Sequence, residues 1–181
     1  MDIINILLSS LQSGAVDKMA SKFGADPDTL SQVIASLTPK LTNEIKTKLA
    51  DPETDSAPII EKATDPEIQE IAERADEYIE REDIVEKGND LLGYITGSKE
   101  KSKEIASQVA QETGFDYSII KQLLPIVAPI VMGSLGKTLG GSGNVSDVKS
   151  AESSLLSFLD FDNDGSVMDD IIGMAGKFLR S

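Results

Sequence analysis

The sequence IIKQLLPIVAPIVM, residues 119–132, lies in the longest apolar stretch of the chain, which runs from Ile119 to Leu135. Apolar residues cover nearly all sides of a helix drawn through it, so we expect this helix to be the central, buried one. Lys121, Gln122 and two prolines interrupt the stretch, which falls short of the roughly 20 clean apolar residues that a membrane span needs. It therefore predicts a core helix and no membrane span.

A shift of 90 residues aligns this region with the beginning of the chain. Six aligned pairs are identical, namely Ala20 with Ala110, Gly24 with Gly114, Asp26 with Asp116, Gln32 with Gln122, Pro39 with Pro129, and Leu49 with Leu139. They include a helix-ending glycine, a capping aspartate and a helix-interrupting proline. Glycine, capping aspartate and proline set backbone geometry, so their coincidence favours a true internal duplication over chance. We predict two related helical units, 1–50 and 99–139.

Helical periodicity dominates the whole sequence and strand alternation is nearly absent, so we predict an all-α fold. Gly24 ends one helix, and Asp26-Pro27 opens the next with a capping carboxylate followed by a proline. Asp65-Pro66 repeats that start signal further along. Pro39 predicts a kink in its helix, or a restart capped by Thr38.

The segment from Asp51 to Glu86 contains 14 acids and only three bases. We expect 51–98 to be an acidic linker followed by an exposed helix at 65–97, with a thin apolar stripe that adds little to the core. An acidic run of this kind is usually a solvated helix face. The functional alternative is a docking strip for a basic partner.

The composition excludes several kinds of active site. The chain contains no histidine and no cysteine, which rules out Ser-His-Asp and Cys-His catalysis, thiolate metal sites and His-ligated zinc. A metal site would have to be built from oxygen ligands, which suit Ca²⁺ or Mg²⁺. We therefore expect a non-enzymatic protein.

The net charge of −14 repels phosphate backbones and anionic membrane surfaces. Nucleic acid is excluded as a partner on this ground, and cations or an unknown protein partner with a basic surface fit better. The N-terminus carries Asp2 where a signal peptide would carry a base, so we expect a cytoplasmic protein.

The clearest chemical motif lies in the last segment, 140–181, which we divide into a Gly-rich linker and a helix–Asp loop–helix unit. It reads DFDNDGSVMDD from Asp160 to Asp170. An EF-hand-like loop places ligands at positions 1, 3, 5 and 7, with glycine at position 6. The predicted Ca²⁺ ligands are Asp160, Asp162, Asp164, the carbonyl of Ser166, and Asp169 or Asp170.

This loop departs from the EF-hand pattern at position 12, where Ile171 replaces the bidentate glutamate. Either adjacent aspartate would have to substitute, which shortens the loop and weakens binding. The alternative is an Asp-rich turn in which Ser166 or Asp169 caps the following helix.

A second motif, Gly133 to Thr138, ends in Gly-Lys-Thr like a nucleotide-binding P-loop. The pattern requires glycine at the position of Val131, and a preceding strand where this chain has a helix. We therefore interpret Gly133 and Gly136 as marks of a weakened helix end.

Two stretches carry a family resemblance: LLPIVAPIVMG at 123–133 and LDFDNDGSVMDDI at 159–171. Together with Gly24-Ala25-Asp26-Pro27, they resemble the bacterial family called domain of unknown function 937. The resemblance implies a bacterial, all-helical protein without an assigned activity, and it supplies no catalytic residues.

Two classes of function stay open from the sequence. The first is a non-enzymatic helical interaction or scaffold protein, stabilised by Ca²⁺ at the C-terminal loop. The second is a small-ligand carrier or an enzyme that uses a cleft between the two repeats. A carrier should enclose a large apolar pocket, whereas a scaffold should bury that surface against itself or a partner.

Overall fold

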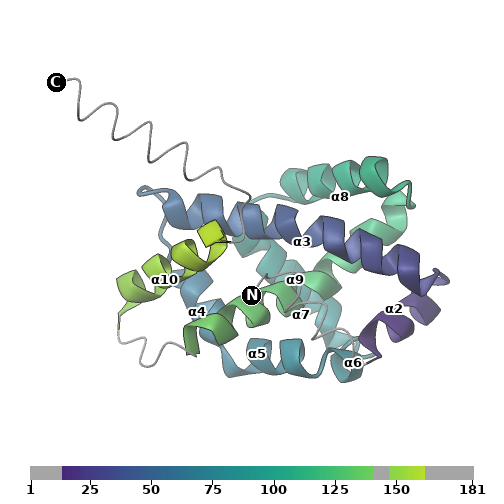
Figure 1. Ribbon diagram of the computed structural model, residues 1–181, viewed down its shortest axis with the longest axis horizontal. Coiled ribbons are helices and arrows are strands. Elements are labelled where there is room, and N and C mark those ends of the chain that lie inside the picture. The colour runs from purple at the N-terminus through teal and green to yellow at the C-terminus, as the bar shows by residue number, and fades with distance from the viewer. Residues whose placement is uncertain (1–13, 141–146, 162–181) are drawn as a thin grey trace.

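The computed structural model describes residues 14–140 and 147–161. These residues form nine α-helices and no strand, so the predicted all-α class is confirmed for this part of the chain. The first 13 residues of the predicted unit 1–50 lie outside it. Figure 1 shows α9 in the middle of the molecule, with α3 and α8 on one side and α5 on the other.

The helices follow one another with short connections. In chain order they are α2 (Ala15–Phe23), α3 (Pro27–Ala50), α4 (Ala57–Thr64), α5 (Pro66–Glu73), α6 (Ala75–Tyr78), α7 (Asp83–Thr96), α8 (Lys99–Thr113), α9 (Tyr117–Gly140) and α10 (Val148–Phe161).

Helix α9 is the core of the fold, as its apolar sequence predicts. It contacts α3, α4, α5, α7, α8 and α10, and every residue from Leu123 to Gly136 is buried. By length and composition alone, Tyr117–Leu139 could cross a membrane, with a mean hydropathy of 1.6. In the folded chain 83% of its most apolar window is buried by other helices, which is how the core helix of a globular bundle behaves.

Two helix pairs, α2–α3 and α8–α9, are joined by similar turns. Gly24 and Gly114 both adopt left-handed backbone conformations, with φ of 64° and 70°. Their amides donate to the carbonyls of Ala20 and Ala110, so each closes the C-terminus of the shorter helix. The left-handed region is accessible to glycine without a steric penalty, which explains why this residue type stands at both positions.

The long helix of each pair is also started in the same way. Asp26 accepts a hydrogen bond from the amide of Thr29 at 3.1 Å, and Asp116 accepts one from the amide of Ser118 at 2.8 Å. Helices α3 and α9 are both 24 residues long, and their bounds are offset by 90 residues at both ends. The helix starts predicted from aspartate are thus confirmed.

Helix α3 continues through Pro39, so the chain does not restart there. Thr38 does not cap a new helix; its hydroxyl donates to the carbonyl of Ile34 at 2.7 Å. A proline inside a helix removes one backbone hydrogen bond, at a cost of about 3 kcal/mol. Buried residues on both sides of Pro39, such as Leu37 and Leu41, hold the helix together across the break.

The acidic segment is folded differently from the prediction. Instead of one exposed helix at 65–97, the chain forms α5, α6 and α7, and α5 and α7 pack directly on α9. The acidic side does face solvent, but the expectation that the segment adds little to the core is wrong. Its buried apolar residues are Ile68, Ile71, Ala72, Ala75, Tyr78, Ile79, Ile84, Leu91, Leu92 and Ile95. Each fully buried isoleucine stabilises the fold by about 1.5–3 kcal/mol, which outweighs the weak mutual repulsion of solvated acids.

Three glycines allow the helices around α9 to approach closely. A methyl group added at Gly88 would lie 1.6 Å from the carbonyl oxygen of Pro125, and one at Gly136 would lie 1.6 Å from that of Ala63. At Gly133 the nearest atom would be the carbonyl oxygen of Ile68, at 2.2 Å. Gly133 and Gly136 therefore do not mark a weakened helix end; α9 continues to Gly140, and these glycines are packing positions.

Helix α10 completes the described body. It contacts α3, α4 and α9 through buried Ala151, Leu155 and Leu159. The hydroxyl of Ser56 donates to the carboxylate of Glu152 at 2.7 Å, which fastens the start of α4 to α10. Helix α10 is the helix expected to lead into the Asp-rich loop.

Candidate functional site

The predicted Ca²⁺ ligands fall mostly beyond the part of the chain that the structure describes. Asp160 lies in the last turn of α10, while Asp162, Asp164, Ser166, Asp169 and Asp170 lie outside the described residues. Within the described ranges, no group of three or more acidic side chains is arranged to hold a metal ion. The cation site therefore stays a prediction from the sequence.

A cleft lies where α7, α8 and α9 meet, and the sequence does not reveal it. Its volume is about 740 Å³, within the range of small-ligand sites. The lining residues are Asn89, Leu92, Gly93, Thr96, Gly97, Ser98, Lys99, Ser102, Lys103, Lys121 and Leu124. Three of them are lysines and none is acidic, which is unusual in a chain with a net charge of −14.

The three lysines of the cleft differ from most other bases in their surroundings. Lys99, Lys103 and Lys121 are exposed and form no ion pair with any other described residue. By contrast, Lys101, which lies between Lys99 and Lys103 on α8, pairs with Glu44 at 3.3 Å and with Glu104 at 3.4 Å. The cleft thus collects positive charge that the fold leaves uncompensated.

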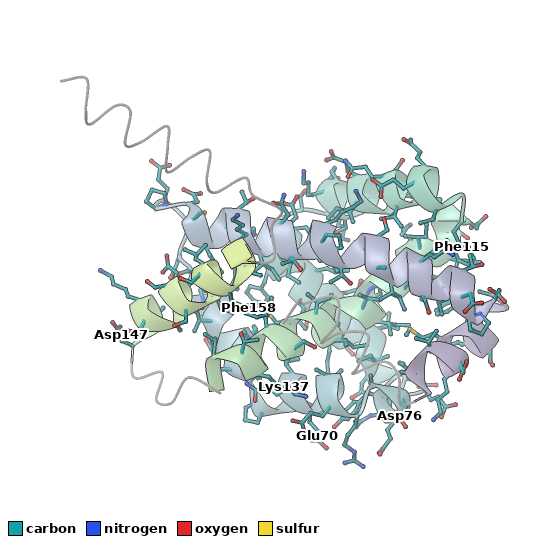
Figure 2. All side chains as sticks on the ribbon, viewed as in Figure 1. Glu70, Asp76, Phe115, Lys137, Asp147 and Phe158 are labelled. Atoms are coloured by element: carbon teal, nitrogen blue, oxygen red, sulfur yellow. The ribbon has the colours of Figure 1, made fainter. Side chains whose placement is uncertain are left out.

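Other bases are held by acids in the usual way. Arg74 pairs with Glu70 and Glu77, and Lys137 on α9 pairs with Glu73 on α5 at 3.3 Å. Figure 2 shows Glu70 on the outer side of this part of the molecule. Each of these exposed ion pairs contributes little to the stability of the fold. In each, however, an acid neutralises the positive charge of the base.

The start of α8 shapes one wall of the cleft. The hydroxyl of Ser98 accepts a hydrogen bond from the amide of Lys101 at 3.1 Å and caps the helix. Buried Thr96 donates to the carbonyl of Leu92 at 2.7 Å, and its hydroxyl lies 3.0 Å from that of Ser102. These bonds fix the chain between α7 and α8, so the wall that carries Lys99 and Lys103 is ordered.

An adjoining hollow of about 570 Å³ shares Asn89 and Gly93 with the cleft, but its charges are mixed. Lys87 there pairs with Glu67 and with Asp83, and its hydrogen bond to Glu67 is the main cause that raises the pKa of Lys87. The lining of the hollow thus contains acids beside its lysines, whereas lysines are the only charged residues that line the cleft.

Four carboxyl groups near the surface have lowered pKa values: Asp51, Asp83, Glu112 and Asp116. In each, a hydrogen bond with a neighbouring side chain is the largest cause; for Asp116 the partner is Ser118. A lowered pKa keeps the group ionised at neutral pH, which is the reverse of what a general acid needs. The stability that these groups add is present above their unfolded pKa and is lost as the pH falls through the lowered values.

The comparison with protein families gives a match over most of the chain. The model of the bacterial proteins of unknown function named DUF937 matches residues 5–138. The chain belongs to this family. The DUF937 match includes the acidic segment and ends before α10, so it covers the lysine-lined cleft and leaves out the Asp-rich stretch. No curated protein and no solved structure matches the chain.

One signal in the sequence points to part of the cleft. Three lysines stand close together in KEKSK, residues 99–103, directly after a glycine and a capping serine. Lys121 lies far from them in the sequence and comes to the same cleft only because α8 and α9 form a hairpin. The place of Lys121 in the cleft is therefore visible only in the folded structure.

Proposed function

We propose that this member of DUF937 is a non-enzymatic helical interaction protein, in which the helices form a scaffold and binding takes place on its surface. Its strongly negative charge favours cations and basic protein surfaces as partners.

The observation that carries the proposal is the filled junction between the two helix pairs. Helix α3 packs against α8 and α9, and the side chains of Leu37, Leu41, Val127 and Val131 have no exposed surface. A carrier or an enzyme that used a cleft between the pairs would need space where these side chains lie. The charged residues of the described helices instead lie outside the apolar core, where they can meet a partner.

The alternative function, a small-ligand carrier, is tested with an apolar dye. Native protein is titrated with Nile red, whose emission shifts to shorter wavelengths in an apolar pocket. We expect no saturable binding, because the apolar faces of α3 and α9 are already buried against each other. Protein partly unfolded by denaturant, which exposes the same faces, serves as the positive control. Saturable, stoichiometric binding to the native protein would refute the scaffold proposal.

Two finer features belong to the same proposal. The first is an internal duplication, supported by the matching turns, caps and helix lengths of α2–α3 and α8–α9 at an offset of 90 residues. The second is a Ca²⁺ ion bound by the C-terminal loop, supported by the 1-3-5 spacing of Asp160, Asp162 and Asp164. Bound Ca²⁺ would stabilise the end of the scaffold beyond α10.

A further inference from the structure

The lysine-lined cleft between α7, α8 and α9 is the strongest unexplained feature of the described surface. It contains Lys99, Lys103 and Lys121 and no acidic residue. Of the described bases, only these three and Lys149 on α10 have no hydrogen bond, ion pair or ring contact with another described residue. Three of the four such lysines therefore gather around one volume.

Gathered like charges raise the electrostatic energy of the folded protein unless an ion of opposite sign compensates them. No acidic side chain lines this cleft; Asp90, next to Asn89, lines the adjoining hollow instead. Glu104 is held by Lys101, while Glu100, in the first turn of α8, does not line the cleft. A bound anion would supply the missing negative charge.

The overall charge of −14 does not prevent anion binding at this place. At physiological salt, interactions between exposed charges are screened beyond roughly 8 Å. Acids farther from the cleft than this therefore contribute little to its potential, and the lysines that line it dominate.

The lining indicates which anion would fit. Lysine binds phosphate as a point charge, and the side-chain amide of Asn89 adds a hydrogen-bond donor. The N-terminus of α8 adds partial positive charge to the same wall. Buried Leu92 and Leu124 offer an apolar floor for an uncharged portion of the ligand. Three separate ammonium groups match several linked phosphates better than one.

We propose that this cleft binds a small anion that carries two or more phosphate groups. The inference goes beyond the scaffold function and does not depend on it. The site is formed within one chain by the second half of α7, the first turns of α8 and the second turn of α9.

The test is calorimetric titration of the full chain with sodium tripolyphosphate at about 150 mM salt, with sulfate as the comparison anion. We expect saturable 1:1 binding of tripolyphosphate and much weaker binding of sulfate. Each of Lys99→Gln, Lys103→Gln and Lys121→Gln should weaken binding by roughly twofold to fivefold, and the triple variant by roughly 10-fold to 100-fold. Raising the salt to 300 mM should also weaken binding, because the contacts are electrostatic.

Lys149→Gln is the matched control, because it removes the same charge from a lysine that is also exposed and unpaired but lies on α10. Its affinity should stay within about twofold of the wild type, since a charge outside the cleft is screened. Thermal melts establish that each variant is folded. If the triple variant is unfolded, the affinities of the single variants decide whether the cleft lysines bind tripolyphosphate. Absence of saturable binding to the wild type, or an equal loss in Lys149→Gln and the cleft variants, would overturn the proposal.

Discussion

At the scale of single residues, the close helix contacts depend on glycines that no hydrophobic pattern reveals. Gly88 and Gly93 stand five positions apart on α7, and the sequence does not distinguish them. A side chain at Gly88 would collide with the backbone of Pro125, whereas one at Gly93 would meet nothing within 4 Å. Glycine has no side chain to classify as apolar or polar, so its packing role becomes visible only in the fold.

This contrast gives a direct prediction for stability. Gly88→Ala should lower the free energy of unfolding by about 1–3 kcal/mol, because the backbone of α9 cannot yield without shifting the core helix. Gly93→Ala on the same helix should be neutral or stabilise by up to about 1 kcal/mol, since alanine favours the helix and space is free. Urea denaturation measures the free energy of unfolding of both variants. An equal change in the two variants would contradict close packing of α7 on α9 at Gly88.

At the scale of helices, capping signals predict the structure well and charge counting does not. Asp26 and Asp65 start helices as predicted, and Asp65 accepts from the amide of Glu67 at 2.8 Å. The apolar stripe from Ile68 to Ile79 can be recognised in the sequence. Because it contains few residues, the sequence does not indicate how much apolar surface it buries in the core. The acids on the outer face are solvated at little cost, so the few apolar residues decide which way the segment faces.

The candidate cation site can be predicted from the sequence alone, because its spacing is local. The lysine-lined cleft cannot be found in that way, since Lys121 and the lysines of α8 meet only through the α8–α9 hairpin. The one fragment that stands out in the sequence, the lysines at 99–103, is also typical of an ordinary solvated helix face.

The C-terminal loop, which follows α10, carries a prediction about Ca²⁺. If the loop binds the ion, Ca²⁺ at 100 times the dissociation constant should add about 2.7 kcal/mol to the stability of the wild type. Asp162→Ala should abolish this increment, because it removes the ligand at position 3. Asp147→Ala, directly before α10 and outside the Asp-rich stretch, should keep it.

Thermal melts with and without millimolar Ca²⁺ provide the measurement. An unchanged melting temperature of the wild type, together with no heat in calorimetric titration, would identify the segment as a capped turn.

At the scale of the whole molecule, the fold is a bundle organised around one apolar helix. Helices α3, α8 and α10, together with α4, α5 and α7 from segment 51–98, contribute side chains that bury α9. The apolar stretch at 119–132 is sufficient to predict this centre, because no other part of the chain has apolar residues on so many sides. The arrangement of the covering helices cannot be predicted, since it depends on close contacts such as those at Gly133 and Gly136.

The central structural claim is that the acidic segment is an integral part of the core. Native-state hydrogen exchange tests it most directly, because amides of segments that open only with global unfolding share the same high protection. We predict that the buried positions of α5 and α7 exchange at rates close to those of α9. If α5 and α7 instead exchanged orders of magnitude faster than α9, the acidic segment would be a loosely attached surface element and the claim would be wrong.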